Sequence, residues 1–89
     1  MNQAEAQIIA EKELPESSYD LVILEDETIT KEWGWVFFYQ TKAFVESGDF
    51  RDMLGGNAPI IVNRVTGDVT ITGTAHDIEH YINEYEQSL

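Results

Sequence analysis

The distribution of apolar and polar residues predicts a helix near each end of the chain. Residues 3–14 are good helix formers with three large apolar residues among them, and Pro15 ends this predicted helix. Near the other end, four apolar residues have the i, i+3, i+4, i+7 spacing of a helix face that packs on a core: Ile78, Tyr81, Ile82 and Tyr85. Thr74, with Asp77 three positions later, is expected to cap the start of this second helix.

Four segments between these helices have the β-branched and aromatic composition of strands. They are residues 19–24, 33–40, 58–63 and 69–72. Segment 33–40 is apolar at odd and even positions alike, so we expect a central strand that is covered on both faces. The last two segments flank a turn in which Gly67 is expected at positive φ, and this pattern predicts a β-hairpin.

Two further segments are less regular. Residues 25–32 form an acidic hinge, and residues 41–54 predict an irregular helical passage that Gly55 and Gly56 end with a left-handed cap. The apolar anchors expected in that passage are Phe44, Val45, Phe50, Met53 and Leu54. The element order α-β-β-(α)-β-β-α predicts an α+β fold: a small antiparallel four-stranded sheet with N- and C-terminal helices packed on it. Residues 1–89 are expected to form a single domain.

The charge of the chain narrows its range of partners. Seventeen acidic residues against five basic ones give a net charge of −12, which repels nucleic acids and anionic membranes. Such a charge serves solubility, or it steers a basic partner toward the protein. The chain has no cysteine, no basic start typical of a signal peptide and no apolar run of the roughly 20 residues that span a membrane. We therefore expect a cytoplasmic protein.

One motif suggests metal chemistry. Residues 76–80 read H-D-I-E-H, the H-x-x-E-H pattern in which inverted zinc peptidases hold a metal ion. However, His76 falls in the frayed first turn of its predicted helix, and the short chain offers no second metal-binding helix. We therefore expect two solvated histidines, with no metal and no cofactor. The chain also lacks a nucleophile elbow and a phosphate-binding loop, so we do not expect an enzyme.

A partner-binding surface is expected where carboxylates and an aromatic residue crowd together. Residues 25–33 carry four carboxylates, and Lys31 is the only basic residue among them. Such like charges repel one another, and a docked basic surface would relieve that repulsion. The predicted binding residues are Glu25, Asp26, Glu27, Glu32 and Trp33.

Two alternatives stay open for this prediction. Trp33 suits the core as well as an interface, whereas Trp35, deeper in the apolar segment, is expected in the core. If the acidic segment is merely solvated, the binding face is expected on the polar side of the last helix, around Glu79, Asn83 and Glu86.

A series of short motifs runs in order along residues 33–86, which are 54 of the 89 residues. Its members are Trp33 with the aromatic strand, Phe44 to Asp49, Leu54 to Pro59, Ile60 to Val62, Thr66 to Asp68, Gly73 to Ala75, Ile78-Glu79, Tyr81 and Tyr85-Glu86. This ordered series resembles the YrhB-like family of bacterial immunity proteins, also called immunity protein 35. That family often has a proline where this chain has Asp77, and either residue suits a first helical turn.

The resemblance implies an α+β protein that is encoded beside a polymorphic toxin, binds it and neutralises it. It implies neither a cofactor nor a catalytic residue, and the expected partner is a cognate toxin domain with a basic surface. The alternative function is a chaperone-like or other small interaction module without catalytic activity. Such a module would bind many denatured proteins weakly, whereas an immunity protein forms one tight complex.

Overall fold

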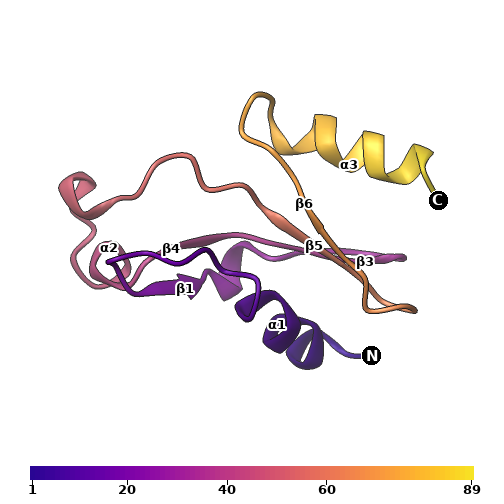
Figure 1. Cartoon of the computed structure of the whole chain (residues 1–89), viewed down its shortest axis with the longest axis horizontal. Helices are drawn as coiled ribbons and strands as arrows, with labels where there is room; N and C mark the ends of the chain where they lie inside the picture. The colour runs from indigo at the N-terminus through magenta and orange to yellow at the C-terminus, as the bar shows by residue number, and fades with distance from the viewer.

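The computed structural model describes all 89 residues. The main sheet lies between α1 on one face and α3 on the other, so the body of the protein has three layers (Figure 1). The helices are α1 (Gln3–Glu11), α2 (Lys42–Ser47) and α3 (Ile78–Gln87). The strands are β1 (Leu21–Ile23), β2 (Ile29–Lys31), β3 (Gly34–Phe37), β4 (Tyr39–Thr41), β5 (Ile60–Asn63) and β6 (Val69–Ile71). Two single-turn 3-10 helices, η1 (Glu25–Glu27) and η2 (Phe50–Asp52), complete the chain.

The main sheet has four antiparallel strands in the order β2-β3-β5-β6, and β1 pairs with β4 in a separate two-stranded sheet. The α+β class and the terminal helices packed on the sheet are therefore confirmed. The membership of the sheet differs from the prediction, because β2 lies within the residues predicted as an acidic hinge. The predicted strand 19–24 instead supplies β1 to the smaller sheet. β2 is a three-residue edge strand with one neighbour, too short for its pattern to stand out.

The apolar segment 33–40 forms two strands and not one. β3 ends at Phe37 and β4 begins at Tyr39, and the two strands belong to different sheets. Phe38 lies between them, and its carbonyl accepts a hydrogen bond from the Leu24 amide at 2.8 Å. Hydrophobicity does not mark this break, because it arises where the pairing partner changes from β5 to β1.

Side chains of β3 and β5 alternate between two cores, so the prediction of a central strand covered on both faces is confirmed for β3. On the face toward α1, eight buried residues pack together: Ala6, Ala10, Ile23, Trp35, Phe37, Tyr39, Ile60 and Val62. On the face toward α3 the buried cluster is smaller and consists of Val36, Ile61 and Ile82. Ile82 is the one fully buried residue of α3, so the attachment of this helix depends on a narrow apolar stripe.

α1 begins at a capping box. The side chain of Asn2 accepts a hydrogen bond from the Glu5 amide at 2.9 Å, and the Glu5 carboxylate accepts one from the Asn2 amide at 3.0 Å. The helix ends at Glu11, before the predicted end at Leu14. No helix in the chain combines the length and the apolar character that crossing a membrane requires.

The start of α3 differs from the predicted cap. Asp77 is the N-cap, and its carboxylate accepts a hydrogen bond from the His80 amide at 3.1 Å, so Thr74 does not cap the helix. The turn before the helix is held by Tyr81, whose hydroxyl accepts hydrogen bonds from two amides of that turn at 3.1 and 3.2 Å. Tyr81 is half-buried, and its hydroxyl ties the turn to the helix.

Left-handed glycines end α2 and close the β5–β6 hairpin. Gly48, with φ of 68°, is the C-cap of α2. Gly56 has the left-handed conformation predicted for it, with φ of 74°, but neither Gly55 nor Gly56 caps a helix, so the predicted cap is wrong. The early stop divides the predicted passage 41–54 into α2 and η2. Gly67 has φ of 76° in the turn before β6, which confirms the predicted hairpin geometry.

Candidate partner-binding surface

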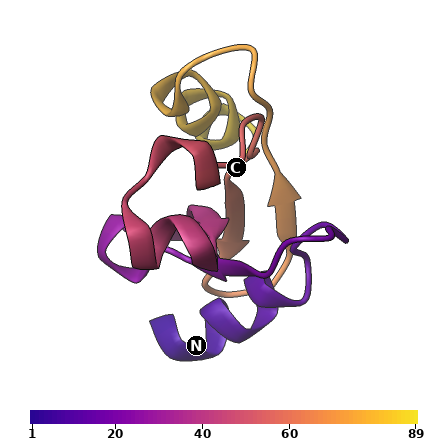
Figure 2. The ribbon, with the colours of Figure 1, turned by 90° about the vertical axis from the view of Figure 1, so that its left-hand side faces the viewer.

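The acidic segment Glu25–Glu27 forms η1, which lies between β1 and β2 along the chain and lines the same groove as α2. Figure 2 looks onto the end of the molecule that carries α2. Its single turn is closed by hydrogen bonds from the Glu27 amide to the Leu24 carbonyl at 3.0 Å and from the Thr28 amide to the Glu25 carbonyl at 3.2 Å. All three acidic side chains are exposed, and none of the ion pairs in the chain includes them. The one side chain that binds a carboxylate here is Gln7 of α1, which donates to Glu25 at 2.8 Å.

A groove of about 520 Å³ separates η1 from α2. The three acids of η1 line one side of it, and Phe44, Val45 and Gly48 line the other, with Ile23 and Leu24 between them. The groove is therefore apolar where α2 and β1 meet and negatively charged along one rim. This combination suits a partner side chain that is apolar and has cationic neighbours.

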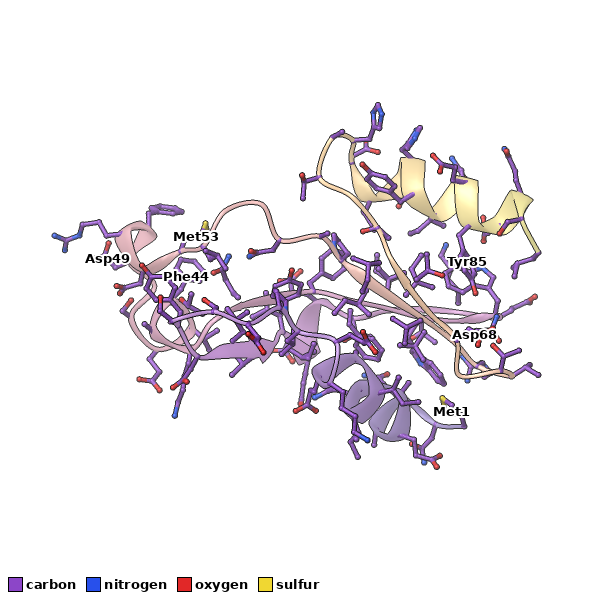
Figure 3. All side chains as sticks on the ribbon, in the orientation of Figure 1. Met1, Phe44, Asp49, Met53, Asp68 and Tyr85 are labelled. Atoms are coloured by element: carbon purple, nitrogen blue, oxygen red, sulfur yellow. The ribbon has the colours of Figure 1, made fainter.

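Exposed apolar side chains continue beside this groove. Figure 3 shows Phe44 and Met53 close to Asp49 at this end of the molecule. Phe50 of η2 is 80% exposed, and its ring centroid lies 6.4 Å from that of Phe44. Val45 and Met53 are also exposed, so the prediction that these residues anchor the helical passage in the core is wrong for Val45, Phe50 and Met53. Both long helices pack on the main sheet and not on this end, and the short α2 leaves one side of itself in solvent.

Two buried polar residues of β4 hold the segment that carries Phe50. The side chain of Gln40 donates to the Leu54 carbonyl and accepts from the Leu54 amide, both at 2.8 Å. The hydroxyl of Thr41 donates to the Asp52 carbonyl at 2.6 Å. Gln40 and Thr41 are almost completely buried, and these bonds attach residues 52–54 to β4.

The two cations at this end of the molecule are already paired. Arg51 contacts the Asp49 carboxylate at 2.6 Å, and this bond lowers the pKa of Asp49 below its ordinary value. Lys42 lies 3.9 Å from Glu46 one helical turn away. Because neither cation reaches η1, the charge of the acidic segment is not compensated within the chain.

The structure divides the five predicted binding residues between two places. Glu25, Asp26 and Glu27 precede β2, whereas Glu32 and Trp33 follow it in the β2–β3 turn. The indole of Trp33 packs on Tyr85 of α3, with ring centroids 4.6 Å apart, and its N–H donates to the Glu86 carboxylate at 2.9 Å. Figure 3 shows Tyr85 pointing from α3 toward the sheet. Trp33 is thus half-buried and ties the β2–β3 turn to α3.

The polar side of α3, the alternative surface, is partly engaged in contacts of its own. Glu79 and Asn83 are exposed, but the carboxylate of Glu86 accepts the hydrogen bond from Trp33. A second groove of about 470 Å³ lies between β6 and α3. It has a single carboxylate, Glu84, which contacts His80 at 2.8 Å, so this groove lacks the cluster of acids that lines the groove beside η1.

The histidine pair lies at the start of α3, and neither histidine lines either groove. The ring centroids of His76 and His80 are 4.0 Å apart, and both residues are exposed. No group of three or more potential ligands in the chain is placed to hold a metal ion. The motif that resembles a peptidase site therefore brings its two imidazoles together, and the carboxylate that contacts His80 belongs to Glu84, outside the motif.

Replacing both His76 and His80 with alanine is expected to leave the fold and partner binding unchanged. Both side chains are solvated, and an exposed i, i+4 contact such as His80–Glu84 stabilises a helix by about 0.3–0.5 kcal/mol. Thermal unfolding and partner binding measure the two effects. As a control, Tyr81→Phe removes the acceptor of two amide hydrogen bonds and should cost about 1 kcal/mol. Stoichiometric zinc in the purified protein, lost together with partner binding in the double variant, would contradict the prediction.

Comparison with known proteins places the chain among immunity proteins. The family model of immunity protein 35 matches residues 4–86. The uncharacterized protein YrhB of Escherichia coli (strain K12) is 40% identical over 53 residues, which are 60% of this chain and 56% of the relative, so the match spans little more than half of the relative's length. No solved structure matches the chain. The family match confirms the resemblance seen in the sequence motifs and extends it from the β2–β3 turn back to α1.

Proposed function

Because the chain belongs to the immunity protein 35 family, we propose that it binds a cognate bacterial toxin domain and neutralises it through a protein–protein contact. The family match over residues 4–86 is the observation that carries this proposal. An inhibitor of this kind needs no reacting group of its own, because covering the active site of the toxin is sufficient. It needs a stable surface that is complementary to the toxin in shape and charge.

The charge of the chain supports a toxin with a basic surface. The net charge is −12, and the three carboxylates of η1 have no cationic partner in the fold. Opposite charge on the partner accelerates association and disfavours wrong partners. On this ground we assign Glu25, Asp26 and Glu27 to the toxin-binding face. We assign Trp33 to the attachment of α3, because its ring and its N–H are both engaged within the protein.

The test of this function combines the chain with the toxin domain encoded beside it. Coexpressed, the two are expected to elute as one stoichiometric complex, and the chain should protect sensitive cells from the toxin. A chaperone-like module would instead bind many denatured proteins weakly and leave the folded toxin active. Failure of the wild-type chain to bind and protect would refute the proposed function.

Reversing the charge of Glu25, Asp26 and Glu27 to lysine is expected to slow association with the toxin about tenfold or more at low salt. The substitutions remove a field that steers a basic partner, so the rate should also become less sensitive to ionic strength. Stopped-flow mixing at two salt concentrations measures both effects.

A matched variant controls for total charge. Glu13, Glu16 and Asp68 are also exposed and line none of the surface hollows that contain η1 residues, and their reversal to lysine changes the net charge by the same amount at a different place. This control should slow association much less than the η1 variant. Equal rates for the two variants would show that overall charge, and not the position of η1, governs association.

A further inference from the structure

We propose that the groove between η1 and α2 is the anchoring pocket of the toxin interface and receives an apolar side chain of the toxin that is flanked by lysine or arginine. This inference rests on the proposed function and specifies which surface performs it. Three features of the groove carry it: exposed aromatic surface, rigid support and uncompensated negative charge on one rim.

The exposed aromatic surface is larger than the fold requires. Phe50 is 80% exposed, so it contributes little to the core, and a polar residue would serve the fold equally well at this position. Phe44 lines the groove 6.4 Å away, and Val45 beside it is exposed as well. Adjacent exposed apolar residues in a small protein are typical of binding sites, and aromatic residues are frequent energetic centres of interfaces.

The support beneath these side chains is rigid. Buried Gln40 and Thr41 hold the end of η2 and the residues that follow it through hydrogen bonds of 2.6 to 2.8 Å to Asp52 and Leu54. The side chain of Asn57 adds a bond of 3.0 Å to the Leu54 carbonyl. A surface that is fixed before binding loses little conformational entropy when the partner docks, so it suits a tight complex.

The charge around the groove selects the occupant. The carboxylates of η1 line it, and the neighbouring cations Lys42 and Arg51 are paired with other acids. A partner that brings an apolar side chain alone would leave these carboxylates near a dehydrated interface without compensation. A flanking lysine or arginine on the toxin supplies the missing charge. The groove between β6 and α3 does not select a cationic partner in this way, because one carboxylate lines it and not three.

The experiment measures the affinity of the toxin domain encoded beside this chain for wild-type protein and for two variants matched in exposure. Phe50→Ala should raise the Kd at least tenfold, mainly through faster dissociation. Val65→Ala removes an apolar side chain that is 88% exposed in the β5–β6 turn, and it should change the Kd less than twofold. Both variants should unfold at nearly the wild-type temperature, because neither side chain is buried.

A second substitution tests the chemistry of the occupant. Phe50→Lys places a cation beside the groove, so it should weaken a complex with a basic toxin more than Phe50→Ala does. Phe50 lies beside the groove, so Val45→Ala, which removes an exposed side chain from the groove lining, accompanies Phe50→Ala and should raise the Kd severalfold. If the wild-type chain binds the toxin but Phe50→Ala, Val45→Ala and Val65→Ala all bind equally well, the groove is not the anchor, although the proposed function stands. If Phe50→Lys binds as tightly as the wild type, the cationic occupant is ruled out. If the wild-type chain itself fails to bind, the proposed function falls and this inference falls with it.

Discussion

Replacing Gly34 with alanine is expected to destabilise the protein more than a glycine-to-alanine substitution at any other position of the chain. A Cβ atom at Gly34 would lie 2.0 Å from the carbonyl oxygen of Val62, a distance that no side-chain movement relieves because the oxygen belongs to the backbone of β5. The residue also has φ of 155°, which non-glycine residues rarely adopt. β3 and β5 are the two central strands, so their separation would open both cores.

The expected loss is about 3 kcal/mol or more, because backbone strain and overpacking each cost about 1–3 kcal/mol. For a domain of this size such a loss lowers the unfolding temperature by about 12 °C or more. Two glycine variants separate the contributions. Gly55→Ala meets no atom within 4 Å and has no positive φ, so it should be neutral, whereas Gly48→Ala adds backbone strain without a clash. A variant Gly34→Ala as stable as Gly55→Ala would contradict the close approach of β3 and β5.

Replacing Trp35 with alanine is expected to cost about 3–5 kcal/mol, the range for large aromatic residues in protein cores. Trp35 is 2% exposed at the centre of the core that β3, β5 and α1 share. The guanidinium carbon of Arg64 lies 4.1 Å from the centroid of its ring. Arg64 also donates hydrogen bonds to the carbonyls of Glu32 and Lys31, so the ring helps to position the arginine that holds the β2–β3 turn.

Chemical denaturation of Trp35→Ala and Trp35→Phe measures this effect. The phenylalanine variant keeps part of the ring volume and should lose less stability than the alanine variant. Trp33→Phe is the matched change in the half-buried neighbour, where it removes the hydrogen bond to Glu86 and should cost only about 1 kcal/mol. Equal losses at Trp33 and Trp35 would mean that the two tryptophans do not differ in burial as described.

Elements with strong local signals are predictable from the residues alone. The apolar stripe of α3, the helix formers of α1 and the turn at Gly67 each lie within one short segment, and each has the predicted structure. The errors fall where local signals are ambiguous or compete. Thr74 and Asp77 both suit a helix cap, and the hydrogen bonds of the preceding turn to Tyr81 decide in favour of Asp77.

β2 and the break at Phe38 could not be predicted from local sequence, because both depend on which strands pair. β2 is an unremarkable segment of Ile, Thr and Lys, and it becomes a strand because β3 offers it a free edge. The apolar run around Phe38 looks continuous, because hydrophobicity reports burial and not the identity of the neighbouring strand. The same limit applies to Trp33, which faces α3 although Trp35, two residues later, faces α1.

The candidate site also combines a feature that the sequence predicts with features that only the fold decides. The density of carboxylates at residues 25–27 is a property of the chain, so it was visible before any fold was known. Their separation from Trp33 could not be predicted, because it depends on β2, a strand that the sequence pattern does not predict. The three residues of β2 span roughly 10 Å when extended and place Trp33 at the other end of the strand. The exposure of Phe50 was also hidden, since an apolar residue between polar neighbours predicts burial and exposure almost equally well.

Fold class, negative charge and family resemblance follow from the residues themselves, because periodicity, charge and ordered motifs are all read along the chain. The groove follows only from the folded molecule, because residues 23–27 and 44–48 are distant in sequence and meet through the pairing of β1 with β4. Which apolar side chains remain in solvent is likewise decided in three dimensions. Burial depends on whether another layer covers a segment, and neither α1 nor α3 reaches the end of the molecule where α2 and η2 lie.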